Sequence, residues 1–214
     1  MAGHPAASAF VSARTQELIA VVLMSLTAIL TAWCGFEASK WGGATSIAFS
    51  EASSARIEAS RLHNNGSVRQ SVHVGLFAEW VQATGMGNTD AASFIADRFP
   101  EPLATAFAEW ISAHPLSDPA SPTSPFDMPA YALPEVAAAD AANARADARY
   151  DDALRSSDRS DAYTILTVLF AIVLFFAALT GRIGSPWART IVLGLAVALF
   201  IGGATLLAVM PKLL

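Results

Sequence analysis

Three long apolar segments constrain this chain more than any other feature of its sequence. Residues 18–36, 162–180 and 191–210 contain no Asp, Glu, Lys, Arg or His. Each is close to the length of about 20 apolar residues that a helix needs to cross a hydrocarbon core of about 30 Å. Buried core helices of soluble proteins are rarely so long and so uniformly apolar. We therefore predict three transmembrane helices, at 18–36, 162–180 and 188–210.

The composition of the 214 residues supports that prediction and excludes other classes. Apolar residues make up 54% of the chain and charged residues only 14%, against about 25% charged in an average soluble domain. This composition argues against a disordered chain. The net charge of −5 argues against a nucleic-acid partner, which a basic surface would attract. One cysteine excludes an intrachain disulfide and a multi-cysteine zinc site.

Basic residues in the short flanks predict how the chain is oriented. Arg14 is the only basic residue before the first apolar segment apart from His4, and no small-residue cleavage site follows that segment, so we interpret it as an uncleaved anchor. Arg14, Arg182 and Arg189 all lie on one side of a three-span chain, and that side is expected to be cytoplasmic. The prediction is a cytoplasmic N-terminus (1–17), a cytoplasmic loop (181–187), an extracytoplasmic domain (37–161) and an extracytoplasmic C-terminus (211–214).

The domain at 37–161 is expected to be helical and to be built on two long helices that continue into the first and second spans. Small and apolar residues recur at steps of three and four in two stripes, the pattern of a helix–helix seam. The first stripe is Trp41, Ala44, Ala48, Ala52, Ala55, Ala59 and Leu62, and the second is Ala139, Ala142, Ala146, Tyr150, Ala153 and Ser157. If the two helices are antiparallel the stripes face each other, which predicts an all-α antiparallel bundle.

Between the two stripes the sequence predicts breaks and short helices. Asn64-Asn65-Gly66 is expected to kink or break the first long helix, because glycine costs about 1 kcal/mol relative to alanine inside a helix. Short helices are predicted at 90–99, with a cap at Asn88, Thr89 or Asp90, and from Pro102 to about Ala113.

Residues 114–134, which we call the strap, are rich in proline and are not expected to form a regular helix. They also carry apolar side chains that a flexible linker would lack. We predict an extended segment docked on its own domain, and its candidate docking residues are Pro125, Phe126, Met128 and Tyr131. Binding of a proline-recognising partner is the alternative.

A short internal repeat marks candidate binding residues. The sequence Phe77-Ala78-Glu79-Trp80 recurs as Phe107-Ala108-Glu109-Trp110. Residues three apart share a helix face, so Phe77 and Trp80, and likewise Phe107 and Trp110, form aromatic pairs. The two pairs either bury their rings in a common core or form an exposed hot spot for a partner.

The third span carries small residues at regular spacing. Gly194, Ala198 and Gly202 recur every four residues, which lets helix backbones approach closely in lipid. The partner is another span of the same chain, a second copy, or a different membrane protein. We expect a homo-oligomer or a complex with another membrane protein.

No motif for catalysis, metal binding or nucleotide binding occurs. The histidines lack ligand spacing, and the charge run from Arg145 to Asp161 alternates in sign, as on a solvated helix face with pairs such as Asp152 with Arg155. The spans lack the ionisable residues typical of ion-coupled carriers. We expect no enzyme activity, no metal and no cofactor. A pore lined by hydroxyl residues such as Thr27 and Thr167 is the alternative.

Three parts of the sequence carry a resemblance: Ala52-x3-Arg56-x-Glu58-Ala59-x-Arg61, the pair Phe77-x2-Trp80, and Ser124-Pro125-Phe126-x-Met128-Pro129-x-Tyr131. Together they resemble a group of small bacterial inner-membrane proteins of uncharacterised role. Members of that group have one span before and two spans after an alanine-rich extracytoplasmic helical domain. The resemblance implies a bacterial inner membrane and supplies no activity.

The resulting hypothesis is a non-enzymatic membrane protein that acts as a scaffold or accessory subunit, surrounded by membrane lipid. A homo-oligomeric channel and an extracytoplasmic ligand-sensing accessory protein are the alternatives. A conducting path would favour the channel, and a cavity in the domain at 37–161 would favour the sensor.

Overall fold

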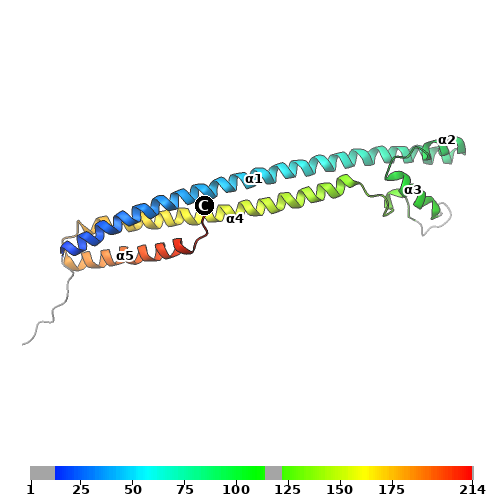
Figure 1. Cartoon of the computed structure of the whole chain (residues 1–214). Helices are drawn as coiled ribbons and strands as arrows, with labels where there is room; N and C mark the ends of the chain where they lie inside the picture. Colours follow the sequence, from blue (N-terminus) through cyan, green and yellow to red (C-terminus); the bar gives the residue numbers. More distant parts are fainter. Residues whose placement is uncertain (1–12, 114–121, 214) are drawn as a thin grey trace, which may run out of the picture. The chain divides into compact units, whose positions relative to one another are not determined.

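The computed structural model describes residues 13–113 and 122–213, and within these ranges it contains helices and no strand (Figure 1). The elements are α1 (Ala13–Gly85), α2 (Thr89–Ala96), α3 (Leu103–Ser112), a 3-10 turn η1 (Pro125–Asp127), α4 (Pro134–Thr180) and α5 (Pro186–Val209). The predicted all-helical fold is confirmed for this part of the chain. Helices α1, α4 and α5 each hold a stretch long and apolar enough to cross a membrane.

The chain divides into two compact units, which are described separately. The first unit combines residues 1–49 with 151–214, and the second is residues 50–150. Helices α1 and α4 contribute residues to both units. The three predicted spans fall within α1, α4 and α5 of the first unit, except that α5 ends at Val209 rather than at 210.

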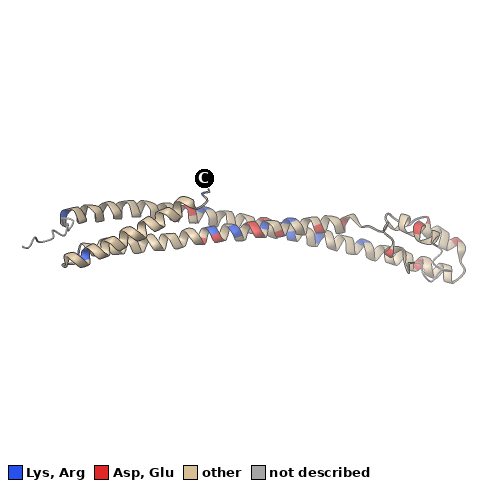
Figure 2. Cartoon of the chain, turned by 90° about the horizontal axis from the view of Figure 1, so that it is seen from below, with Lys and Arg blue, Asp and Glu red and all other residues tan. Residues whose placement is uncertain are grey.

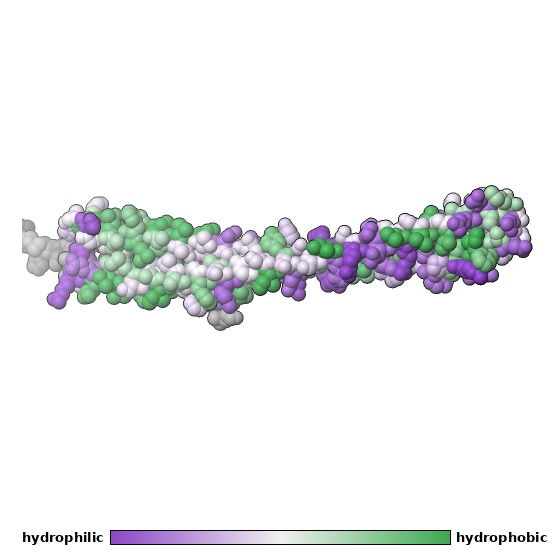
Figure 3. Space-filling model, turned by 90° about the horizontal axis from the view of Figure 1, so that it is seen from above, coloured by the Kyte–Doolittle hydropathy of each residue, from purple (hydrophilic) through white to green (hydrophobic). Residues whose placement is uncertain are grey.

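The first unit is a packing of three apolar helix segments. One buried cluster joins Ala20 and Leu23 of α1 to residues of α4 and α5. A second cluster joins Cys34 and Trp41 of α1 to Tyr163 and Phe170 of α4 and to Leu207 of α5. Charged residues are sparse along these segments (Figure 2), and apolar residues are frequent on their visible surface (Figure 3). Both of these clusters therefore contain residues of α1, α4 and α5.

In the second unit α1 continues unbroken through Asn64-Asn65-Gly66, so the expected break is wrong. Gly66 is buried, and a Cβ atom added there would lie 3.4 Å from the Cβ of Glu135, near the start of α4. The glycine allows this close approach of the two helices. Contacts with α4 thus compensate for the unfavourable helix propensity of Gly66.

The turn after α1 leads into two short helices. Gly87 has φ of 73°, a conformation that favours glycine, and the side chain of Asn88 caps α2 by accepting a hydrogen bond from the backbone N–H of Ala91. Helix α2 ends at Ala96 rather than at residue 99, because the N–H groups of Arg98 and Phe99 bond to carbonyls three residues earlier in a tighter turn.

The described part of the strap begins at Pro122, and residues 114–121 lie outside the described residues. Asp127 caps the turn η1 by accepting two hydrogen bonds from Ser124: the hydroxyl of Ser124 donates to Asp127 Oδ2 at 2.9 Å, and its backbone N–H donates to the same oxygen at 3.1 Å. Leu133 is buried just before α4 begins at Pro134, a residue well suited to the first position of a helix.

Candidate binding site at the aromatic cluster

The four aromatic residues of the sequence repeat meet in the second unit. Trp80 of α1 lies with its ring centroid 4.9 Å from that of Phe107 of α3, and Phe77 of α1 lies 5.4 Å from Trp110 of α3, both pairs edge to face. This geometry is favourable for aromatic pairs. The side chains of Trp80 and Trp110 are buried. Helices α1 and α3 are therefore joined by these rings, as the core interpretation of the repeat expects.

The strap adds to the same cluster. The ring of Phe126 lies 5.6 Å from Phe77 and 4.9 Å from Tyr131, Met128 packs against the buried residues, and Pro125 is buried. The indole N–H of Trp110 donates a hydrogen bond of 2.7 Å to the carbonyl of Pro122. The described residues of the strap thus dock on the helices through the side chains expected to do so. They are not extended throughout, because Pro125–Asp127 form the 3-10 turn η1.

A hollow of about 390 Å³ opens beside these rings. Its lining includes the rings of Phe77, Trp80 and Trp110 and the side chains of Thr84 and Thr123. Val81, also in the lining, is about half exposed. An aromatic hollow with a few polar groups is typical of a binding site for an apolar group. Among the residues that the structure describes, those lining the hollow have no ionisable side chain.

His73 fixes the strap to α1, and sequence reasoning did not identify it. Its Nδ1 atom lies 2.9 Å from the hydroxyl of Tyr131, and its side chain is only 2% exposed. Burial lowers the pKa of His73, nearby Arg69 lowers it further, and Glu135 acts in the opposite direction. Burial likewise raises the pKa of Tyr131. Both groups are therefore held neutral near pH 7.

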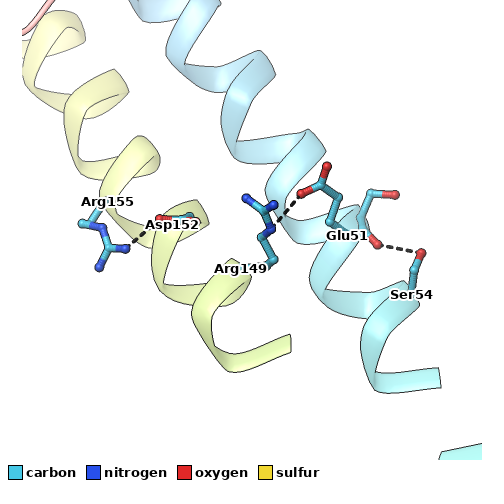
Figure 4. Close-up of polar contacts among 6 residues, drawn as sticks. Glu51, Ser54, Arg149, Asp152 and Arg155 are labelled. Carbon is cyan, nitrogen blue, oxygen red and sulfur yellow. Dashed lines mark hydrogen bonds and ion pairs between the residues drawn. The ribbon is translucent and has the colours of Figure 1, made fainter. Parts of the chain in front are cut away.

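Ion pairs join α1 to α4 along the alanine stripes of the second unit. Arg149 contacts Glu51 at 3.2 Å (Figure 4), and Arg145 contacts Glu58 at 2.9 Å. Further along, Arg69 of α1 contacts Glu135 of α4 at 2.7 Å, so the two helices run in opposite directions over this stretch. The expected pair of Asp152 with Arg155 also forms, within α4 (Figure 4).

The charge run is exposed to solvent, as the sequence suggested, and part of it also pairs with α1. Arg145, Asp147 and Arg149 form ion pairs with residues of α1. Among stripe residues in the second unit, Ala52, Ala59, Ala139, Ala142 and Ala146 are buried. Tyr150, which the sequence placed in the stripe, is 46% exposed, because the bulky ring does not fit a seam of alanines.

The glycine that packs in α5 is one that the predicted stripe left out. A Cβ atom at Gly203 would lie 2.9 Å from the ring of Phe170 on α4, whereas Gly194 and Gly202 have no atom within 4 Å of such a Cβ. Gly194, Ala198 and Gly202 are all exposed. Packing within the chain therefore uses Gly203 and leaves the predicted stripe uncovered by the described residues.

Other sequence features show local roles. The hydroxyls of Thr27 and Thr167 donate to backbone carbonyls four residues earlier in their own helices. Among the residues that the structure describes, no group of His, Cys, Asp and Glu is arranged to hold a metal ion. No family model matches the chain, and neither the curated proteins nor the solved structures give a match.

Proposed function

We propose that this chain is a non-enzymatic integral membrane protein that serves as a scaffold or accessory subunit. Its helical ectodomain recognises an apolar group of a partner protein at the aromatic hollow. The observation that carries the proposal is the open hollow walled by Phe77, Trp80 and Trp110. Aromatic side chains around a pocket are the anchors that protein interfaces favour.

The proposed topology follows the basic residues of the flanks. Residues 1–17 and 181–187 face the cytoplasm, and residues 37–161 lie outside as an antiparallel bundle. The apolar helices support membrane insertion, and the resemblance noted above favours a bacterial inner membrane. The cluster of rings then lies on the extracytoplasmic side, where the partner meets it.

A ligand-sensing accessory protein is the second candidate, and the same hollow favours it. A volume of about 390 Å³ lies within the range of small-molecule sites. The channel has less support, because the span hydroxyls of Ser25, Thr31 and Thr164 are hydrogen bonded to their own helices. Such bonding is the ordinary behaviour of hydroxyl side chains in spans.

Site-specific photocrosslinking in the native membrane tests the proposal. A photoreactive phenylalanine analogue at Val81, in the lining of the hollow, is compared with one at Ile57, which is 68% exposed on α1 outside the hollow. We expect a protein adduct of defined mass from position 81 and not from position 57. An adduct from neither position, or equally from both, would contradict a partner site at the hollow. A small-molecule adduct at position 81 alone would favour the sensor.

A further inference from the structure

An apolar groove runs between α1 and α5 in the first unit. Its part toward the C-terminal end of α5 is a hollow of about 360 Å³ between Ile29 and Trp33 of α1 and Ala204 and Ala208 of α5. A second hollow of about 430 Å³ lies between the same helices nearer to Leu18. The lining is apolar except at one end, where it includes Lys212.

Lys212 is held at this end by contacts on both of its neighbours. The backbone N–H of Leu213 donates to Glu37 Oε2 at 3.1 Å, and the hydroxyl of Tyr163 donates to the carbonyl of Pro211 at 2.9 Å. Glu37 and Tyr163 are fully buried. The segment that follows α5 is therefore fixed to α1 and α4, while Lys212 itself is exposed.

The same end of α1 carries aromatic rings and a second cation. The rings of Trp33 and Phe36 lie 5.9 Å apart, and Lys40 Nζ lies 6.0 Å from the centroid of Phe36. Glu37, the acid nearest to them on α1, is buried and bonded to Leu213. Of the exposed acids in the described residues of this unit, Asp151, Asp158 and Asp161 belong to α4, which does not line the groove, and Glu17 lies near the N-terminal end of α1, away from Lys212. The groove thus ends among aromatic and cationic side chains, a combination typical of the membrane interface.

We propose that this part of the groove binds one anionic phospholipid. An acyl chain lies between Ile29 and Ala208, and Lys212 contacts the phosphate. Glu37 and Tyr163 are positioning residues that hold Lys212 in place. An apolar helix in the groove would leave Lys212 without a counter-charge, whereas a phospholipid satisfies both the apolar walls and the cation. The inference rests on the membrane insertion in the proposed function.

Lipid binding to the full chain in mild detergent tests the inference, because detergent removes loosely associated lipid. Phosphatidylglycerol and phosphatidylcholine with identical acyl chains are added in turn, and native mass spectrometry measures the bound lipid. We expect one phosphatidylglycerol to be retained about fivefold more strongly than phosphatidylcholine, the factor expected from about 1 kcal/mol per lysine at an anionic surface. Lys212→Gln should abolish the preference and Lys212→Arg should keep it.

Two further variants separate the groove from general charge effects. Arg182 is an exposed cation in the loop between α4 and α5, so Arg182→Gln should retain the preference. Tyr163→Phe removes the hydrogen bond to Pro211 and should lower the preference for phosphatidylglycerol. Equal retention of the two lipids by the wild type, or equal losses in the Lys212→Gln and Arg182→Gln variants, would overturn the inference. Washing membranes with carbonate separates the two proposals when the lipid preference is absent. If the chain stays in the washed membranes, only the proposed lipid site is contradicted. If the chain is washed out, the proposed membrane insertion is contradicted as well.

Discussion

His73 links the strap to α1 through a single hydrogen bond to Tyr131, and its environment predicts a dependence of stability on pH. Burial and Arg69 lower the pKa of His73 in the folded chain below its ordinary value of about 6.5. The unfolded chain therefore binds a proton more readily than the folded chain does. The stabilising contribution is complete above pH 6.5 and declines as the pH falls below it toward the lowered pKa.

We expect the melting temperature of the wild type, measured by circular dichroism in detergent, to fall between pH 7.5 and 5.5. The His73→Gln variant should show a smaller fall, because its side chain does not titrate. His63 is exposed on the same helix, so His63→Gln should reproduce the wild-type dependence on pH. Equal slopes for the wild type and His73→Gln would rule out protonation of His73 as the cause.

At the scale of the elements, the stripes of alanine determine how closely α1 and α4 approach. Ala146 is completely buried, and Ala144, two residues away on the same helix, is exposed. Replacing Ala146 by Leu should destabilise the folded chain by about 1–3 kcal/mol, because a tight seam has no room for the larger side chain. Ala144→Leu should change stability little. Chemical unfolding of both variants in detergent measures the difference, and equal stabilities would mean that the seam is not tightly packed.

The elements also show why the sequence predicted the helices better than the site. The apolar segments, the alanine stripes and the helix start at Pro134 are local patterns, and each corresponds to a helix or a buried face. The predicted break at Gly66 was wrong because intrinsic helix propensity takes no account of α4, which packs beside the glycine. The sequence did contain a signal for an unbroken helix with a buried face: Ala59, Gly66, His73 and Trp80 are spaced seven residues apart, and all four are buried.

The hollow itself was beyond sequence reasoning. It requires α3 and the strap to return to the end of α1, which places Trp110 and Thr123 beside Thr84. The repeat identified the rings, but nothing in it fixed the distance between the two copies in space. The sequence also could not predict that Gly203 rather than Gly202 packs on Phe170. That outcome depends on the rotation of α5 about its axis, which its contacts with both α1 and α4 determine.

At the scale of the whole molecule, the exposed small residues of α5 bear on assembly. Among the described residues, no neighbouring atom lies within 4 Å of a Cβ added at Gly194 or Gly202, so isoleucine at both positions should leave the fold of one chain unchanged. A close helix partner from a second copy or another membrane protein would be blocked by the larger side chains, because packing in lipid depends on backbone approach.

We therefore expect the wild type to have a mass larger than one chain in mild detergent or nanodiscs, and the Gly194→Ile, Gly202→Ile variant to have a lower mass. Ala171 and Ala178 are exposed on α4, so their double replacement by Ile is a matched control that should keep the wild-type mass. Circular dichroism verifies that all three proteins have the same helix content. A wild type that is monomeric and free of any copurifying protein would contradict assembly through α5. The same mass in all three proteins would mean that the chain assembles through a different surface, because blocking backbone approach at the small residues of α5 would then have no effect.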